Sequence, residues 1–381
     1  MPSILVMGLQ WGDEGKGRVV DALAAEADVV VRYNGGANAG HTIVDEQGAR
    51  RVTHQIPSGI RRAGVLNLIG RGVVIDPFKL AEEVRAWGAR PGMLGIDPAA
   101  HVTLPVHIEA DRGLEALRGR SAIGTTRSGN GPTYADKHQR TGVRVIDVLR
   151  DPSWSASQLV IGRGADQDEA ERQVRAAAAV LASAGISDML VNVPELLRRL
   201  DVGGRRILFE CAHGFELDLD HGQYPNVTSS PCNVGGVCSG AGFDPRRIDT
   251  VIGIIKPYST RVGAGQLAGE YEPEEASVIR EAGSEYGSTT GRPRRIAALD
   301  LDLLHRASRI NGVDCVAITH MDVAKRVGDL LVVRRGGALT RVHWTEIPSL
   351  VEDALGVPIK YTCHGPNPCE MVGHGDSIWK V

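Results

Sequence analysis

The sequence predicts an α/β fold with a mostly parallel central sheet flanked by helices. Residues 2–7 form an apolar run that suits a buried strand, and a glycine-rich segment, residues 8–17, follows it directly. Apolar residues then recur at helical spacing from Val19 to Ala24, so a strand, a loop and a helix follow one another. A second apolar run, residues 28–33, precedes another glycine cluster. This alternation is typical of an α/β sheet.

The first glycine-rich segment has the composition of a phosphate-binding loop. Its glycines let backbone N–H groups approach an anion, the N-terminus of the following helix adds unpaired donors, and Lys16 adds a positive charge. In a Walker A loop four residues separate the first glycine from Gly-Lys, and Ser or Thr follows. Here six residues separate Gly8 from Gly15, and Gly17 follows the lysine. The fold is therefore expected to be P-loop-like, without the magnesium-binding hydroxyl.

Two carboxylates, Asp13 and Glu14, lie inside this loop. They could be solvated turn residues. However, a carboxylate beside a phosphate is repelled unless a cation or a transferable proton lies between them. Asp13 is therefore expected to be a metal ligand, a base, or both.

A second glycine cluster, residues 34–42, follows the strand predicted at 28–33. Ligands of α/β sheets bind at the carboxyl ends of strands, so we expect the two loops to share one site. His41 could be an ordinary surface histidine. Its position in a second glycine loop favours a working acid or a phosphate donor.

Residues 10–17 and 36–42 together resemble the two signature loops of adenylosuccinate synthetase, which joins aspartate to IMP using GTP. The resemblance implies that Asp13 removes the N1 proton of the purine and binds Mg²⁺ together with the Gly40 carbonyl. It implies that His41 and Lys16 stabilise charge on the transferring phosphoryl group and that Asn38 donates to the 6-oxo group. Further nucleotide- and phosphate-binding residues implied in these loops are Gly12, Glu14, Gly15, Gly17, Ala39 and Thr42.

The bulk composition is that of a globular protein. A net charge of −3 gives no electrostatic reason to expect nucleic acid or a membrane surface as a partner. The sequence has no apolar run as long as a membrane span and no N-terminal signal pattern, so a cytoplasmic location is expected. Its six cysteines lack the Cys-x2-Cys spacing of a zinc site and are expected to be free thiols.

Further elements follow along the chain. Residues 55–61 and 66–75 suit short strands and tight turns, and residues 77–87 and 166–184 have helical periodicity. Strand patterns recur at residues 188–193, 206–212 and 314–319. Together with the resemblance, this predicts a single domain over residues 1–381, with loop and small subdomain insertions. Helical segments are expected at about 78–200, followed by a shortened C-terminal region.

Residues 121–137 contain Gly-Thr-Thr at 124–126 and end with Gly-Pro-x-Tyr-x-Asp-Lys, and they are similar to the synthetase loop that holds the 5′-phosphate of IMP. Hydroxyls, backbone N–H groups and a cation agree with that role, and Thr125 and Thr126 are the expected phosphate donors. A merely flexible loop is the alternative. Arg140 follows at the position where the family reaches an arginine into the partner's phosphate site, which implies a homodimer.

Residues 209–230 resemble the family's third signature, with two departures. Cys211 replaces a glycine, and His213 replaces a glutamine that contacts the IMP nucleotide. A neutral imidazole offers its donor and its acceptor on different ring atoms, so hydrogen-bond recognition must change. Thr228 remains an expected nucleotide contact.

Two later loops match the substrate loops of the family. Gly263-x-Gly265-x-x-Ala268 is a weak dinucleotide fingerprint, and the preferred interpretation is a segment approaching the ribose of IMP and aspartate, with Val262 binding aspartate. Residues 287–295 hold two threonine hydroxyls and three guanidinium groups, and arginines bind carboxylates bidentately. An exposed basic loop is the alternative. The resemblance implies that this loop binds aspartate through Thr289, Thr290, Arg292 and Arg294.

The strand predicted at 314–319 ends in Thr-His-Met-Asp, where the family has Thr-Lys-x-Asp. The resemblance implies that Asp322 accepts hydrogen bonds from guanine and selects GTP over ATP. His320 replaces the usual lysine, and Cys363 replaces a serine in a second guanine loop. The implied guanine-binding residues are His320, Asp322, Cys363, Gly365 and Pro366.

Three functions follow from these patterns. The first is GTP-dependent ligation of aspartate to IMP through a 6-phosphoryl intermediate. The second is a specialised relative that joins aspartate to another 6-oxopurine nucleotide, such as dGMP, with ATP as a possible donor; His213, His320 and Cys363 motivate it. The third is a catalytically silent paralogue, against which the retained Asp13 and His41 argue.

Overall fold

The structure is a computed structural model that describes residues 2–287 and 291–379. Its centre is a nine-stranded sheet. Every neighbouring pair of strands is parallel except β18 and β17, which are antiparallel. The order is β18 (Met371–Gly373), β17 (Ile359–Cys363), β14 (Cys315–Ile318), β10 (Thr250–Ile255), β1 (Ser3–Gly8), β9 (Ile207–Gly214), β2 (Val29–Arg32), β5 (Leu66–Ile69) and β7 (Leu94–Ile96). The predicted mostly parallel sheet is confirmed.

The central strand β1 is buried on both faces. Leu5 and Met7 belong to one core cluster, whereas Ile4 and Val6 belong to another. Because successive side chains of a strand point to opposite faces, the two clusters mark the two sides of the sheet. A strand covered on both sides is apolar throughout, which is why residues 2–7 show no alternation.

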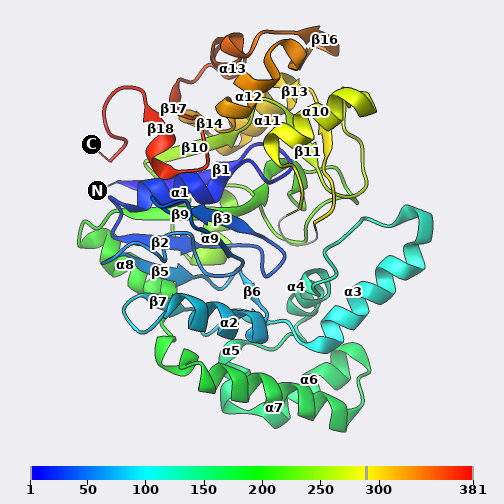
Figure 1. Ribbon diagram of the computed structural model, residues 1–381. Coiled ribbons are helices and arrows are strands. Elements are labelled where there is room, and N and C mark those ends of the chain that lie inside the picture. The colour runs from blue at the N-terminus through cyan, green and yellow to red at the C-terminus, as the bar shows by residue number, and fades with distance from the viewer. Residues whose placement is uncertain (1, 288–290, 380–381) are drawn as a thin grey trace.

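Helices cover both faces of the sheet (Figure 1). Helix α1 (Lys16–Ala24) packs in the cluster that contains Ile4 and Val6. Helices of the second half of the chain contribute to the cluster on the other face. They are α8 (Val193–Val202), α9 (Gly235–Ala241), α10 (Pro273–Gly283), α11 (Leu301–Asn311), α12 (Met321–Val327) and α13 (Ile347–Leu355).

A helical region with its own core comprises α2, which precedes β7, and α3 to α7, which follow β8 (His101–Val102). Its α5, α6 and α7 lie together at the bottom of Figure 1, and α3 projects to the side. The bounds are α2 (Pro77–Trp87), α3 (Pro105–Arg118), α4 (Asn130–Gln139), α5 (Val145–Arg150), α6 (Pro152–Arg163) and α7 (Gln167–Ser183). The helices predicted at 77–87 and 166–184 are confirmed, and Asp166 caps the second one.

Four small sheets hold loops around the carboxyl ends of the large one. A hairpin of β3 and β4 carries His41, and β11 with β12 brackets the loops of the third quarter of the chain. The pairs and the triplet are β3 (His41–Val44) with β4 (Arg50–Thr53), β6 (Val74–Ile75) with β8, β11 (Ser259–Arg261) with β12 (Arg295–Ala297), and β13 (Leu299–Asp300) with β15 (Val332–Arg335) and β16 (Ala338–Arg341).

The strand predicted at 188–193 is wrong. The chain there forms a short 3₁₀ turn, Ile186–Met189, and then enters α8, with Leu190 making a single bridge to Ile96. Asn192 explains the change, because its side chain accepts a hydrogen bond from the Glu195 N–H and starts a helix. Residues 55–61 form turns rather than a strand.

Two further expectations concern chemistry and membranes. All six cysteines are free thiols, as predicted. Within residues 2–287 and 291–379, no helix is both long and apolar enough to cross a bilayer.

Candidate active site

The loops at the carboxyl ends of the central strands enclose a cavity of about 950 Å³. The first two glycine loops meet there, since a Cβ on Gly17 would lie 2.7 Å from the Cβ of His41. The prediction of one shared site is confirmed. The predicted residues that line the cavity are Gly12, Asp13, Gly15, Lys16, Gly17, Asn38, Ala39, Gly40, His41, Thr42, Thr125, Thr126, His213, Thr228, Val262, Arg292, Arg294, His320, Asp322 and Pro366.

Some predicted residues do not line this cavity. Glu14 and Cys363 are buried behind it, Gly365 is buried beside it, and Arg140 is exposed at the end of α4. Thr289 and Thr290 lie outside the described residues. Their role in binding aspartate stays a prediction.

Glu14 folds back into its own loop. Its carboxylate accepts hydrogen bonds from the N–H groups of Gln10 and Gly12, at 3.1 and 2.8 Å, and pairs with the Lys16 ammonium at 2.5 Å. Burial by itself lowers the pKa of Lys16, but Glu14 outweighs burial and the net shift is upward. The lysine is therefore charged, and Glu14 supports the loop from inside rather than facing the cavity.

His41 is oriented by a buried carboxylate on β9. Its Nδ1 contacts Glu210, which also accepts hydrogen bonds from the Ser58 N–H at 2.8 Å and the Ser58 hydroxyl at 2.6 Å. Burial opposes ionisation of Glu210, but His41 and Arg32 outweigh it and lower the pKa of this carboxyl. An ionised Glu210 accepts, so His41 donates from Nδ1 and its Nε2 is the nitrogen left for a ligand. Burial lowers the pKa of His41, which is neutral at rest.

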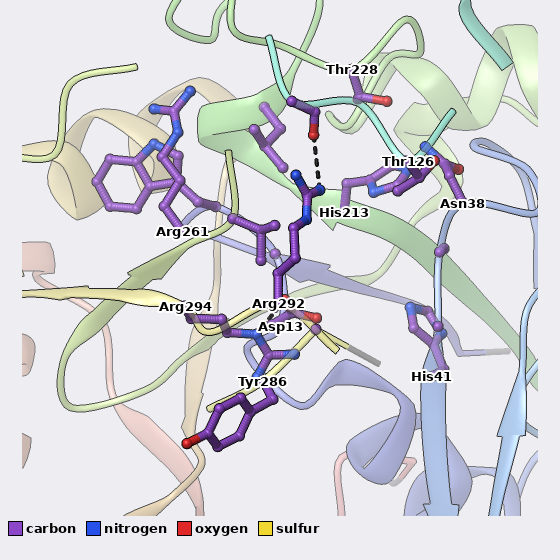
Figure 2. A pocket seen from close by; sticks show the side chains of 18 of the residues that line it. Asp13, Asn38, His41, Thr126, His213, Thr228, Arg261, Tyr286, Arg292 and Arg294 are labelled. Carbon is purple, nitrogen blue, oxygen red and sulfur yellow. Dashed lines mark hydrogen bonds and ion pairs between the residues drawn. The ribbon is translucent and has the colours of Figure 1, made fainter. Parts of the chain in front are cut away.

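Asp13 stands at the end of a second buried chain of charges. Its Oδ2 is 2.9 Å from Arg294 Nε, and Arg294 in turn donates to Glu285 at 2.6 Å. Glu285 also accepts from Lys256 at 2.7 Å and from the Tyr258 hydroxyl at 2.8 Å. Burial raises the pKa of Glu285, but Lys256 and neighbouring cations outweigh it and hold the value at about 2. Figure 2 shows Asp13 near the centre of the pocket, with Arg294 on one side and His41 on the other.

The predicted phosphate loop donates hydrogen bonds to two carboxylates of α3. Glu115 accepts from the Gly124 N–H at 2.8 Å and the Thr125 N–H at 3.2 Å, and Asp111 accepts from the Thr125 hydroxyl at 2.9 Å. Arg292 reaches the same loop and donates to the Gly124 carbonyl at 3.0 Å. The loop is thus ordered by hydrogen bonds to α3, which argues against the alternative of a merely flexible segment.

His213 lies at the end of β9 in the left-handed conformation, with φ 65°. Burial, together with the nearby cation of Arg32, lowers the pKa of His213 to about 3, so its imidazole is neutral. Its Nε2 is buried and has no hydrogen-bond partner among the described residues. In Figure 2 its ring points toward the part of the pocket that Asn38 also faces.

Only three of the five residues predicted to bind guanine line the cavity, namely His320, Asp322 and Pro366. Asp322 lines the cavity and forms an ion pair with Arg326, one helical turn away, at 2.8 Å. His320 precedes α12 and its Nδ1 contacts the Thr319 hydroxyl at 2.8 Å. Burial, followed by the repulsion of Lys256, lowers the pKa of His320 to about 3. His320 is therefore a neutral group where the resemblance places a lysine.

The sequence did not identify two buried residues that hold the predicted site residues in place. Glu210 and Glu285 are fully buried carboxylates, and each contacts a predicted catalytic residue or its partner. A lone glutamate within an apolar strand is the signal that could have found Glu210, because burial of an unpaired carboxylate is costly.

Comparison with known proteins agrees with this geometry. The family model described as adenylosuccinate synthetase matches residues 5–335. The chain belongs to the adenylosuccinate synthetase family. Enzymes of this family are ligases that form a carbon–nitrogen bond, so the predicted enzyme class is confirmed. The matched region ends before Cys363, Gly365 and Pro366, whose role stays a prediction.

Two relatives named adenylosuccinate synthetase are close in sequence. That of Desulforudis audaxviator is 44% identical over 348 residues, which are 88% of this chain and 80% of the relative. That of Moorella thermoacetica is 42% identical over 334 residues, which are 85% and 78%.

Two solved structures share the fold. The fully ligated adenylosuccinate synthetase of Plasmodium falciparum is 28% identical, with a TM-score of 0.88 over 98% of this chain and 99% of that one. The succinoaminodeoxyadenylate synthetase of cyanophage S-2L, bound to dGMP and dATP, is 23% identical, with a TM-score of 0.70 over 98% and 95%. The second likeness concerns the fold alone.

Proposed function

We propose that this synthetase joins L-aspartate to C6 of IMP with GTP as phosphoryl donor, giving adenylosuccinate, GDP and phosphate in purine nucleotide biosynthesis. One observation carries the proposal: a single cavity is lined by Asp13, Lys16 and His41 and also by Arg292 and Arg294. A base, two phosphate-binding groups and two arginine forks are the parts that such a ligation needs.

The first step activates the 6-oxo group. Asp13 accepts the N1 proton of the purine, and the O6 lone pair attacks the γ-phosphorus while the bond to GDP breaks. Asn38 donates to O6. The charge of the arriving phosphate favours protonation of His41 at Nε2, after which His41 donates to the phosphoryl oxygens. Glu210 holds the ring in position for this contact.

The second step forms the carbon–nitrogen bond. The amine of aspartate attacks C6, the C6–O6 bond breaks as phosphate leaves with the former O6, and the departing phosphate accepts the proton that the amine loses. Arg292 and Arg294 anchor the aspartate carboxylates together with Val262. Thr289 and Thr290 are expected to bind aspartate as well. Arg294 contacts Asp13 at 2.9 Å, so the same side chain can link the base to the aspartate subsite.

Lys16 has to change partner when phosphate binds. In this structure it pairs with Glu14 at 2.5 Å, at 3% exposure. A phosphate of the nucleotide offers the lysine a second anion at the mouth of the same loop. Because Glu14 also holds two backbone N–H groups, it keeps the loop closed while Lys16 turns outward.

Magnesium fits the oxygen donors at this site. Among the described residues, no group of three or more His, Cys, Asp or Glu side chains is placed to hold a metal ion. Mg²⁺ is usually held by one or two carboxylates together with substrate phosphates and water, so a sparse protein set is compatible with it. Asp13, whose side chain is 33% exposed, and the Gly40 carbonyl would hold it. When bound, Mg²⁺ neutralises phosphate charge.

The assembly and the organisation of the chain are part of the proposal. Arg140 is exposed at the end of α4, away from this cavity, as an arginine reaching into a partner's phosphate site would be. We therefore propose a homodimer, and a single domain over residues 1–381 with the helical region inserted in it. The cytoplasmic location expected from the sequence stays a prediction.

The alternative is ligation of aspartate to another 6-oxopurine nucleotide, such as dGMP, with ATP as donor. His213 and His320, both neutral and both lining the cavity, motivate it. Two features count against it. The relatives named adenylosuccinate synthetase are 42–44% identical, whereas the dGMP-bound synthetase is 23% identical. Asp322 also remains in place at the cavity wall to accept from guanine.

A substrate matrix tests the proposal. IMP, GMP and dGMP are each combined with GTP and with ATP in the presence of aspartate and Mg²⁺, and phosphate release and product absorbance are followed. We expect IMP with GTP to give the highest kcat/KM. Turnover of another pair while IMP with GTP stays inert would replace the proposal with the alternative.

A further inference from the structure

Asn130 lines the same cavity but belongs to none of the residue sets described above. It is the first residue of α4, directly after the predicted phosphate loop, and it is 6% exposed. Both of its side-chain atoms, Oδ1 and Nδ2, are buried without a hydrogen-bond partner in the described part of the chain. A buried amide with both atoms unsatisfied is unusual, because each unpaired group disfavours the folded state.

The Asn130 side chain lies against the second glycine loop. A Cβ on Gly36 would be 2.8 Å from Asn130 Oδ1, and a Cβ on Gly35 would be 3.3 Å from His213 Nε2. Consecutive glycines therefore make room for two polar side chains beside the loop that carries Asn38. Asn38 Oδ1 and His213 Nε2 are likewise buried without a partner among the described residues.

These three side chains form a wall of unsatisfied donors and acceptors. A phosphate offers only acceptors, so it would leave the Asn130 Oδ1, itself an acceptor, without a partner. The edge of a purine base offers both N–H donors and ring-nitrogen or oxo acceptors, which an amide matches in one plane. The neutral imidazole of His213 provides a further donor and acceptor.

We propose that Asn130 is a specificity-determining residue that hydrogen-bonds the base of the 6-oxopurine nucleotide, on the same wall as His213 and Asn38. The inference rests on the proposed function, since it takes its substrate class from there. It adds a recognition group that lies between the phosphate loop and the 6-oxo subsite.

The test compares Asn130→Leu with Gln167→Leu, which removes an exposed amide from the first residue of another helix, α7. Calorimetry gives Kd for IMP, 2′-deoxy-IMP and GMP, and steady-state kinetics give KM for IMP, GTP and aspartate. For Asn130→Leu we expect Kd and KM for IMP to rise at least about tenfold, as loss of one or two buried hydrogen bonds implies. The values for GTP and aspartate, and all values for Gln167→Leu, should stay within about twofold.

If Asn130 contacts the purine base, a second and sharper prediction follows. The preference for IMP over GMP should change at least about fivefold in Asn130→Leu, while the preference for IMP over 2′-deoxy-IMP stays the same. A change confined to the 2′-deoxy comparison would place the amide on the sugar and overturn the proposal. Unchanged affinity for IMP would overturn it as well. If Asn130→Leu does not fold, Asn130→Ser, which suits a helix start, carries the same comparison.

The binding readout separates this inference from the proposed function. If the unmodified protein binds IMP, but neither GTP nor ATP supports ligation of aspartate to it, the proposed function fails. The effect of Asn130→Leu on Kd for IMP still decides the role of Asn130. If the unmodified protein binds none of the three nucleotides, both fall.

Discussion

The floor and the wall of the cavity differ in how their polar side chains are satisfied. The floor consists of three buried charge networks: Glu14 with Lys16, Glu210 with His41, and Glu285 with Arg294 and Asp13. The wall consists of Asn38, Asn130 and His213, each with a buried polar atom that has no partner within the described residues.

The difference separates two tasks. The networks on the floor hold Asp13 and His41 in position before any substrate arrives, which is how preorganised sites lower a barrier. Unsatisfied atoms on the wall gain their partners only from a ligand, so they contribute to choosing it. We therefore expect changes on the floor to reduce kcat and changes on the wall to alter KM and substrate preference.

The largest effect is expected for Asp13, the proposed general base on the floor of the cavity. Asp13→Ala should lower kcat by roughly 10³-fold, because Asp13 is the proposed general base and general bases contribute about 10²–10⁴-fold. Kd for IMP, measured by calorimetry, should change by less than about threefold. Asp220→Ala, an exposed aspartate outside the cavity, is the control. Substantial turnover by Asp13→Ala would contradict its role as base.

The next effect tests the orienting carboxylate. Glu210→Gln should lower kcat about 10²-fold with a small change in KM, because an amide can also donate to His41 Nδ1 and so no longer fixes the Nδ1–H tautomer. Glu210 opposes the downward shift that burial imposes on the pKa of His41, so the alkaline limb of the kcat profile, where protonated His41 is lost, should move to lower pH. Glu216→Gln, a buried glutamate paired with Arg306 outside the cavity, is the control. An unshifted profile would leave Glu210 a structural role only.

A smaller effect is expected at His320, in the pocket predicted to select the triphosphate. His320→Lys should raise the preference for GTP over ATP roughly tenfold, because a lysine donates to the 6-oxo group of guanine and repels the amino group of adenine. The measurement is the ratio of kcat/KM for the two triphosphates. Cys363→Ser is the matched change, and because Cys363 is fully buried behind the cavity it should alter this ratio less than about twofold. A larger response from Cys363→Ser would reverse our assignment.

The smallest effect concerns stability rather than rate. His213 has a pKa of about 3 in the folded protein and about 6.5 when unfolded, so between these values the unfolded chain binds a proton that the folded chain excludes. The free energy of unfolding should therefore fall as the pH drops below about 6.5. Compared with the unmodified protein, His213→Gln should lose less Tm between about pH 7 and pH 4, by roughly a few degrees. Parallel Tm curves would show that His213 titrates freely.

Much of the floor could be predicted from the sequence because it lies in short, contiguous loops. Asp13, Lys16 and His41 belong to two glycine clusters that follow apolar runs, and the end of a parallel strand is where such loops meet. The resemblance to known synthetases then supplied their roles. The strand at 188–193 was mispredicted because Asn192 caps a helix that its apolar neighbours conceal.

The supporting residues could not be predicted in the same way. Glu210 and His41 are separated by 169 residues, and the contact exists only because β9 and β2 are neighbours in the sheet. Asn130 has no neighbour in sequence that marks it as a recognition group. Only the closeness of its side chain to Gly36, and its two unsatisfied atoms, reveal it.

We infer above all that the floor residues transfer a phosphoryl group to O6 before aspartate attacks. IMP labelled with ¹⁸O at the 6-oxo position tests it most directly, with unlabelled GTP and aspartate and mass analysis of the released phosphate. We predict one ¹⁸O in each phosphate formed by the unmodified protein, and formation of labelled phosphate roughly 10³-fold more slowly by Asp13→Ala. Phosphate without the label, formed together with adenylosuccinate, would contradict the claim.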